Sequence, residues 1–144
     1  MEPKVIAGNG PIVIVDDGDM DFFIARTCYE KSRLGNELVR FDSGRAFLEY
    51  LAARHESGEP LPVLVLLDIN MPGMDGFDTL NAVRSSAEFK EVPIIAMLTN
   101  SDSDRDRSRS LDLGANDFFT KPMDISDYVA FFDSLIDRLS SPTD

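Results

Sequence analysis

Val63-Leu64-Val65-Leu66-Leu67-Asp68 is a continuous apolar run that ends on a carboxylate. A strand covered by helices on both faces has no polar face, so an uninterrupted run of this kind is typical of the inside of a parallel sheet. Mostly apolar runs also occupy 11–15, 37–41 and 94–98, and the shorter range 117–120 carries two phenylalanines. We interpret these five ranges as strands.

The segments between these runs have the spacing of amphipathic helices. Apolar side chains recur at intervals of three and four, most clearly in 125–139. Short apolar runs that alternate with such segments predict an α/β fold, in which right-handed crossovers give one doubly wound parallel sheet. The functional groups of such a sheet lie at the carboxyl ends of its strands.

The composition narrows the class of protein. A length of 144 residues suits one domain without disulfides or structural zinc. The net charge of −12 would repel a phosphate backbone, so nucleic acid is not an expected partner. The single cysteine, Cys28, suits the reducing cytoplasm. Every apolar run is much shorter than the roughly 20 residues that cross a bilayer, so no membrane partner is expected.

Polar side chains follow four of the expected strands. Asp16 and Asp17 follow the first, Asp68 the third, Thr99 the fourth and Lys121 the fifth. Each alone has an ordinary structural explanation, such as a helix cap or a turn residue. A doubly wound sheet, however, brings these strand ends together in one crevice.

Three converging carboxylates would need a counter-charge. Two like unit charges about 5 Å apart repel by roughly 3 kcal/mol at an effective dielectric of about 20. Lys121 alone cannot offset three such pairs, so either one carboxyl keeps its proton or a divalent cation binds. Hard oxygen ligands favour Mg²⁺, which keeps waters that a phosphate can replace. The pattern therefore predicts a metal-assisted phosphoryl site.

Four stretches resemble the signature of bacterial response-regulator receiver domains. They are Ile12-Val13-Ile14-Val15-Asp16-Asp17, Leu66-Leu67-Asp68-Ile69-Asn70-Met71-Pro72-Gly73-Met74-Asp75-Gly76, Ala96-Met97-Leu98-Thr99 and Phe118-Phe119-Thr120-Lys121-Pro122. The resemblance covers 11–139, flanked by expected flexible tails at 1–10 and 140–144. It implies a flavodoxin-like sheet of order 2-1-3-4-5 with five helices, as in chemotaxis regulators. The Thr-Lys-Pro ending further resembles stand-alone regulators that work with phytochrome-type sensor kinases.

The resemblance assigns roles to matching positions. Asp68 would be the phosphoacceptor. Asp17 would bind Mg²⁺ directly and Asp16 largely through water, with Asp68 and the backbone carbonyl of Asn70 as further ligands.

Further roles concern the phosphoryl group. Thr99 would donate its hydroxyl to a phosphoryl oxygen, and Lys121 would pair with the phosphorylated carboxylate. Phe118 would be the rotating aromatic residue beside Thr99. The resemblance also implies a cis peptide bond between Lys121 and Pro122.

The implied function is signalling rather than enzymatic turnover. A sensor histidine kinase would donate the phosphoryl group to Asp68. Because we expect no output domain after the fold, the regulator would act by binding a downstream protein or by passing its phosphate to a phosphotransfer partner.

Two segments depart from the family pattern. Residues 101–110 contain no apolar side chain, so we expect the fourth helix to be short or labile and to begin its packing near Leu111. Phe131 falls off the apolar stripe of the last helix. It indicates either a homodimer or partner contact, or an isolated exposed aromatic side chain.

Two other functions remain open. A magnesium-dependent phosphatase of the haloacid-dehalogenase type also carries aspartates after its first strand, and Asp17-Gly18-Asp19 fits its Asp-x-Asp pattern, but that function leaves Asp68 unexplained. A pseudo-receiver would bind partners without phosphorylation. Against it, every residue of the acceptor set is present.

Overall fold

The computed structural model describes residues 10–89, 92 and 94–139, in which strands and helices alternate. The elements are β1 (Ile12–Val15), α1 (Asp19–Lys31), β2 (Leu38–Phe41), α2 (Gly44–Ser57), β3 (Leu64–Leu67), α3 (Gly76–Ser85), β4 (Ile95–Thr99), α4 (Asp104–Asp112), β5 (Asp117–Thr120) and α5 (Ile125–Leu139). Of the expected tails, 1–9 and 140–144 lie outside the described residues. Gly10, which we assigned to the first tail, is buried, and its carbonyl accepts a hydrogen bond from Asn36.

The sheet has the order β2-β1-β3-β4-β5, and every pair of neighbouring strands is parallel. This confirms the predicted five-stranded doubly wound fold. Four strands begin one residue later than predicted. Glu37 and Ile94 precede their strands, and their carbonyls accept hydrogen bonds from Ile12 of β1 and Val65 of β3. The carbonyl of Pro11 accepts from Val63, directly before β3.

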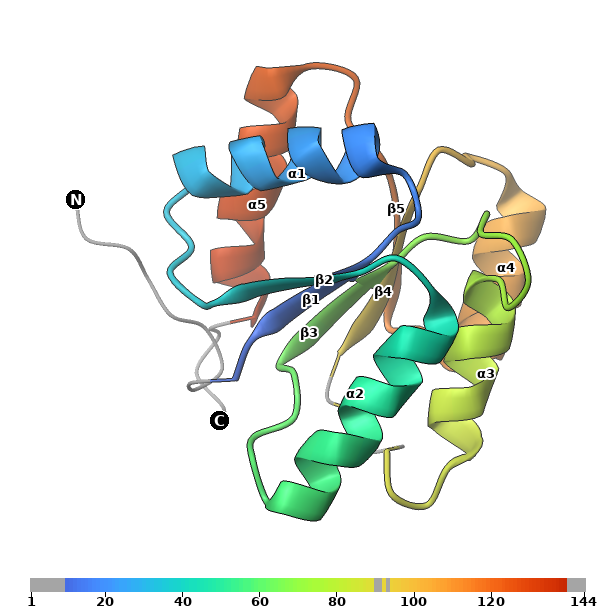
Figure 1. Ribbon diagram of the computed structural model, residues 1–144. Helices are drawn as coiled ribbons and strands as arrows, with labels where there is room; N and C mark the ends of the chain where they lie inside the picture. Colours follow the sequence, from blue (N-terminus) through green and yellow to red (C-terminus); the bar gives the residue numbers. More distant parts are fainter. Residues whose placement is uncertain (1–9, 90–91, 93, 140–144) are drawn as a thin grey trace.

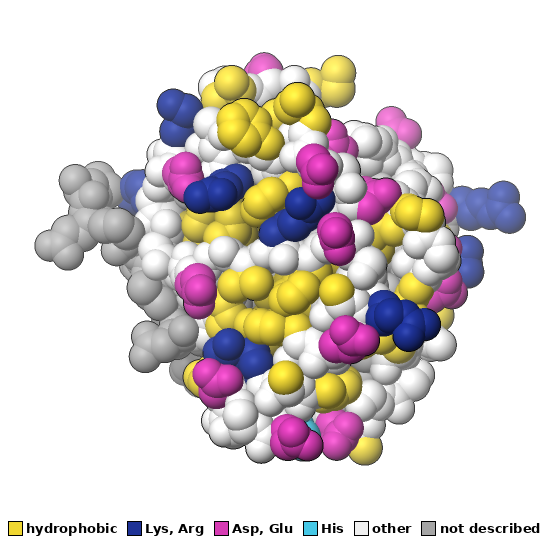
Figure 2. All heavy atoms as spheres, viewed as in Figure 1, with side chains coloured by type: hydrophobic (Ala, Val, Ile, Leu, Met, Phe, Trp, Pro, Cys, Tyr) yellow, Lys and Arg dark blue, Asp and Glu magenta, His cyan; other side chains and the backbone are white. Residues whose placement is uncertain are grey.

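Helices cover both faces of the sheet, as Figure 1 shows: α1 and α5 lie on one side, and α2, α3 and α4 lie on the other. Successive side chains of β1 point alternately toward the two layers of helices. Val13 and Val15 pack with α2 and α3, whereas Ile12 and Ile14 pack with α1 and α5. Two-sided burial is why the central strands are continuously apolar. The edge strand β2 is half-buried throughout. On the side of the molecule that Figure 2 shows, hydrophobic side chains are visible at the surface between α1 and α2.

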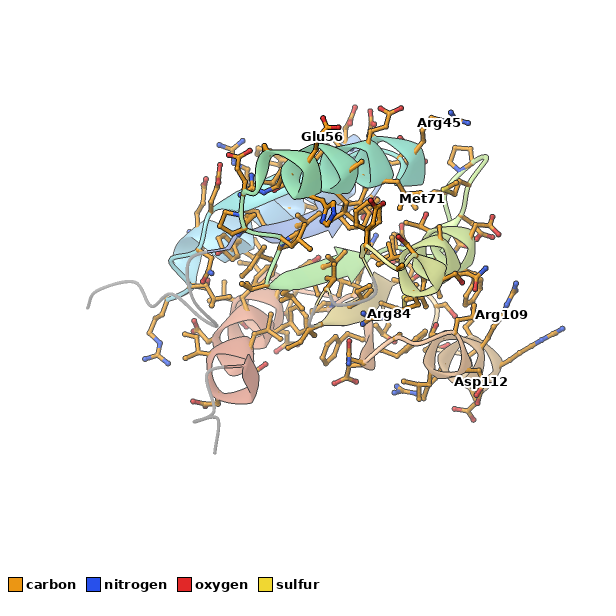
Figure 3. All side chains as sticks on the ribbon, turned by 90° about the horizontal axis from the view of Figure 1, so that it is seen from below. Arg45, Glu56, Met71, Arg84, Arg109 and Asp112 are labelled. Carbon is orange, nitrogen blue, oxygen red and sulfur yellow. The ribbon has the colours of Figure 1, made fainter. Side chains whose placement is uncertain are left out.

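The fourth helix packs differently from our expectation. It is short, as predicted, but Leu111 is 46% exposed and Ser110 is the buried residue. Two arginines contact aromatic rings instead: Arg107 lies 4.9 Å from the centroid of Phe118, and Arg109 lies 4.1 Å from that of Phe77 (Figure 3). A helix without an apolar stripe can thus dock by cation–π contacts.

Arg84, labelled in Figure 3, connects α3 to the segments that precede β4 and β5. Its guanidinium donates hydrogen bonds to the carbonyls of Gly114 (2.9 Å) and Val92 (2.7 Å) and to the side chain of Asn116 (2.8 Å). The planar fork of five N–H donors suits this three-way contact.

Phe131 is not an isolated exposed aromatic side chain. It is half-buried, and its ring centroid lies 4.9 Å from that of Phe119 and 5.3 Å from that of Phe132. Intramolecular packing therefore accounts for the buried part of Phe131, and a homodimer or partner contact stays a prediction. Among the described helices, none is long and apolar enough to span a bilayer.

Candidate phosphoryl and metal site

The carboxyl ends of four parallel strands bring the predicted site residues together. The register aligns Val15 of β1 with Leu67 of β3, so the carboxylates that follow these strands are neighbours. Thr99 is the last residue of β4 and pairs with Thr120 of β5, directly before Lys121. The crossover topology therefore gathers side chains that are more than 100 residues apart in the chain, such as Asp16 and Lys121.

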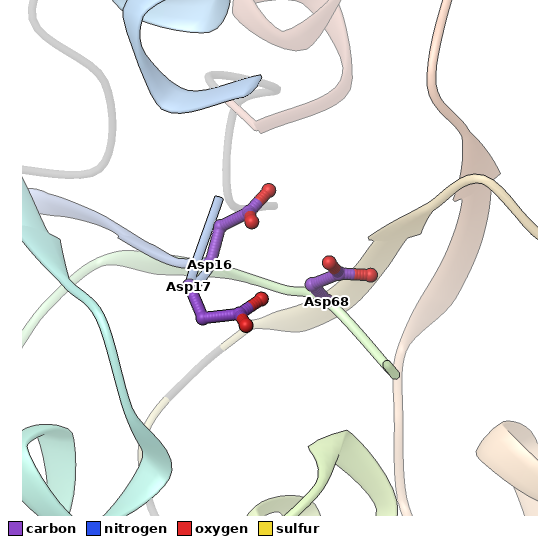
Figure 4. Close-up of side chains that lie close together, drawn as sticks. All are labelled: Asp16, Asp17 and Asp68. Atoms are coloured by element: carbon purple, nitrogen blue, oxygen red, sulfur yellow. The ribbon is translucent and has the colours of Figure 1, made fainter. Parts of the chain in front are cut away.

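Asp16, Asp17 and Asp68 form an acidic cluster, shown in Figure 4. One carboxylate oxygen of each lies within 4.8 Å of the others. Asp16 and Asp68 are buried, whereas Asp17 is exposed. The cluster is therefore reachable from solvent on the Asp17 side and closed behind the other two carboxylates.

Lys121 supplies the positive charge of the site. Its Nζ lies 2.7 Å from Oδ2 of Asp16, 2.9 Å from Oδ2 of Asp21 and 3.5 Å from Oδ2 of Asp68. Burial would lower the pKa of Lys121, but its hydrogen bonds to Asp16 and Asp21 and the charge of Asp68 raise that pKa above its ordinary value. The ammonium is therefore charged at neutral pH.

Asp21 is a site residue that the sequence analysis missed. It lies in the first turn of α1, and its carboxylate is 44% exposed. Its place in the first turn of the helix that directly follows Asp16 and Asp17 was the available signal.

Burial is the main reason why the pKa of Asp68 is raised. The charge of Lys121 and hydrogen bonds with the Thr99 hydroxyl and the Asn70 backbone lower it, and the charge of Asp16 raises it further. Thr99 is fully buried, so its hydroxyl is held beside this carboxylate. A buried, partly compensated carboxylate is a candidate nucleophile.

The turn after Asp68 is closed by backbone hydrogen bonds. The carbonyl of Ile69 accepts from the amides of Met71 (3.2 Å) and Gly76 (2.9 Å). Asp75 then caps α3 in a reciprocal capping box with Asp78. Together these contacts place Asn70 at the exposed rim of the pocket, next to the acidic cluster.

Two further predictions concern Phe118 and the peptide bond before Pro122. Phe118 is buried at the end of the sheet near the site, under the guanidinium of Arg107. The Lys121-Pro122 bond, by contrast, is not cis: the described part of the chain contains no cis peptide bond. The trans form is intrinsically favoured even before proline, and in it Lys121 already reaches Asp16 and Asp68.

The donor set fits a divalent cation with oxygen ligands. Asp16 is already engaged on both oxygens, by the amide of Gly18 at 2.9 Å and by Lys121. Asp17 and Asp68 are therefore the better placed direct ligands, and Asp16 suits an indirect role through water. Mg²⁺ commonly uses one or two carboxylates and retains several waters, which agrees with this arrangement.

Fold and site together define a flavodoxin-like domain with an acidic pocket at the carboxyl edge of its sheet. The sequence profile of the response regulator receiver domain matches residues 12–133. The chain therefore belongs to the receiver-domain family of two-component response regulators.

One relative is the response regulator Rcp1, which matches this chain in both sequence and structure. Response regulator Rcp1 of Synechocystis sp. (strain PCC 6803) is 29% identical over 126 residues, which cover 87% of this chain and 81% of Rcp1. The structure of Mn(2+)-bound Rcp1 has a TM-score of 0.75 at 26% identity and covers 98% of both chains.

Two more solved structures are similar over most of their length. The phosphorylated cyanobacterial phytochrome response regulator RcpA has a TM-score of 0.80 at 25% identity, covering 95% of this chain and 98% of RcpA. The bacteriophytochrome response regulator AtBRR has a TM-score of 0.72 at 33% identity, covering 94% of this chain and 93% of AtBRR. These similarities confirm the resemblance to phytochrome-associated regulators.

Proposed function

We propose that this chain is a phosphoacceptor of a two-component phosphorelay: it takes a phosphoryl group from a sensor histidine kinase on Asp68 and signals through protein contacts. The observation that carries the proposal is the position of Asp68, buried in an acidic cluster with Asp16 and Asp17 and within 3.5 Å of the Lys121 ammonium. The chain acts on itself and does not turn over a substrate.

In the transfer step, an oxygen of Asp68 attacks the phosphorus atom of a phosphohistidine. The P–N bond breaks as the O–P bond forms, and the electron pair of the broken bond stays on the imidazole nitrogen. Asp17, Asp68 and the backbone carbonyl of Asn70 would hold Mg²⁺, with Asp16 acting through water. When bound, Mg²⁺ supplies charge neutralisation for the transferred oxygens.

The remaining site residues bind the transferred group. The Thr99 hydroxyl donates a hydrogen bond to one phosphoryl oxygen, and the Lys121 ammonium pairs with another. Phosphorylation brings the local charge to about −1.5 to −2 and adds strong acceptor oxygens. Movement of Thr99 toward these oxygens changes the packing around Phe118, which is already buried, and this changes the surface formed by α4, β5 and α5.

The proposed donor is a phytochrome-type histidine kinase, because RcpA and AtBRR are described as phytochrome and bacteriophytochrome response regulators. The output is a downstream protein or a phosphotransfer partner, and the net charge of −12 argues against nucleic acid. We place the protein in the cytoplasm, in keeping with its unpaired, buried Cys28.

Intact-protein mass spectrometry after incubation with acetyl phosphate and Mg²⁺ tests the proposal. We expect one added phosphate in the wild type and in the control Asp112→Asn, which removes an exposed carboxylate on α4. Asp68→Asn should remain unmodified. An unmodified wild type would support a pseudo-receiver, and multiple turnover of a phosphoester without an adduct would support a phosphatase.

A further inference from the structure

The Lys121 ammonium is shared among three carboxylates, and Asp68 is the most distant of them. The Nζ–Oδ2 distances are 2.7 Å to Asp16, 2.9 Å to Asp21 and 3.5 Å to Asp68. An ammonium has three N–H donors, so these contacts use its full capacity. In this state Lys121 is therefore held nearer to the α1 side of the pocket than to the proposed phosphoacceptor.

Phosphorylation of Asp68 would change this distribution. The new phosphoryl oxygens attract the ammonium more strongly than a carboxylate does, because the local charge rises to about −1.5 to −2. With all three donors in use, Lys121 can bind a phosphoryl oxygen only by weakening an existing contact. The two candidates for release are Asp16 and Asp21.

The burial of the two carboxylates decides between them. The Asp16 side chain is only 6% exposed, and its second oxygen is held by the Gly18 amide, so a released Asp16 would lose its direct ion pair at a site that bulk water hardly reaches. The Asp21 side chain is 44% exposed, and water can replace the lost hydrogen bond. Asp21 and Lys121 also line a small open hollow of about 90 Å³ together with Asn100. Release of Asp21 is thus the less costly change.

From this geometry we propose that Asp21 is a positioning residue that competes with the phosphoryl group for Lys121. In the unphosphorylated chain Asp21 draws the ammonium away from Asp68, and on phosphorylation Lys121 leaves Asp21. Asp21 therefore lowers the rate at which Asp68 is phosphorylated. The inference rests on the proposed phosphoacceptor function.

The first test is the initial rate of phosphorylation by acetyl phosphate with Mg²⁺. Asp21→Asn should raise the rate by about fivefold, the size expected when an exposed ion pair no longer holds the ammonium. Asp21→Glu, which retains the carboxylate, should restore the wild-type rate. The matched control is Asp19→Asn: it removes the same charge from the same helix turn, but Asp19 pairs with Arg40 instead of Lys121. It should stay at the wild-type rate.

A double-mutant cycle separates positioning from a general charge effect. In a Lys121→Met background, Asp21→Asn should no longer increase the slow residual rate, because the residue it positions is absent. An equal increase in that background, or an Asp21→Asn single variant no faster than the wild type, would overturn the inference. Either result leaves the proposed function intact, provided that the wild type is still phosphorylated on Asp68. An unmodified wild type would instead remove the proposed function itself.

Discussion

The α-carbon of Gly76 lies directly against the backbone of Asp68: a β-carbon at position 76 would overlap the carbonyl oxygen of Asp68 and lie 2.7 Å from the α-carbon of Ile69. The Gly76 amide also donates to the Ile69 carbonyl. The first residue of α3 is thus in contact with the residue that carries the proposed phosphoacceptor carboxylate. Glycine is required here for close approach.

Gly76→Ala should therefore displace Asp68 and reduce both phosphorylation and stability. Overpacking of this kind typically costs about 1–3 kcal/mol. We expect the phosphorylation rate with acetyl phosphate to fall, because Asp68 is displaced from Asp17 and Lys121, and the melting temperature to fall as well. Gly58→Ala is the control. Gly58 has a φ of 75° with open space around it, so that variant should lose stability but keep its phosphorylation rate.

Magnesium should stabilise the folded chain. A ligand that binds only the folded state at about 100 times its Kd adds about 2.7 kcal/mol. Differential scanning calorimetry should show a saturable rise in melting temperature with Mg²⁺ that disappears in Asp17→Asn. The control Asp112→Asn should respond like the wild type. A full response in Asp17→Asn would show that the cation binds elsewhere.

Ionised Asp68 should destabilise the metal-free fold. Because its folded-state pKa is raised, chiefly by burial, folding favours the protonated carboxyl. That favourable contribution is complete below the ordinary pKa of 3.8 and is lost as the pH rises through the raised folded-state pKa. With EDTA present, Asp68→Asn should therefore be more stable than the wild type at pH 7, by on the order of 1 kcal/mol.

Urea unfolding over a pH series measures this difference. The advantage of Asp68→Asn should shrink as the pH falls, because the wild-type carboxyl then takes up its proton. Saturating Mg²⁺ should reduce the advantage as well, since the cation favours ionised Asp68. An advantage independent of pH would exclude the ionisation of Asp68 as its cause.

The arginine contacts of α4 should be measurable as local stability. Arg109→Gln removes the guanidinium that lies over Phe77, and a cation–π contact at a partly exposed site is worth about 0.5–1 kcal/mol. Hydrogen exchange of the α4 amides should become several-fold faster, while exchange in α5 is unchanged. Arg105→Gln is the comparison, since the described residues offer no aromatic ring under Arg105. Equal effects of the two substitutions would contradict the cation–π assignment.

The fold could be predicted from the sequence because burial on both faces leaves a local signature. A run such as 63–67 is apolar at every position, and the long stripe of 125–139 repeats with the period of a helix. The position of the acidic cluster followed from the same reasoning. Asp16, Asp68 and Lys121 each come directly after a strand, Asp17 follows Asp16, and parallel strand ends meet at one edge.

Two features could not be predicted, because they depend on the tertiary surroundings and not on any local pattern. Leu111 was predicted to anchor α4 because it is apolar, but Phe118 of β5 and Phe77 of α3 instead present aromatic rings to Arg107 and Arg109. The predicted cis bond before Pro122 is trans, and Lys121 reaches the acidic cluster nonetheless.

The sequence by itself therefore determined the strands, the helices and the polar residues that follow the strands. Each of these leaves a pattern among residues that are close together in the chain. Which carboxylates share the Lys121 ammonium was decided only by tertiary structure. Asp21 is an ordinary helical residue in the sequence, and it becomes part of the site because the end of β5 brings Lys121, 100 residues away, to within 2.9 Å of it.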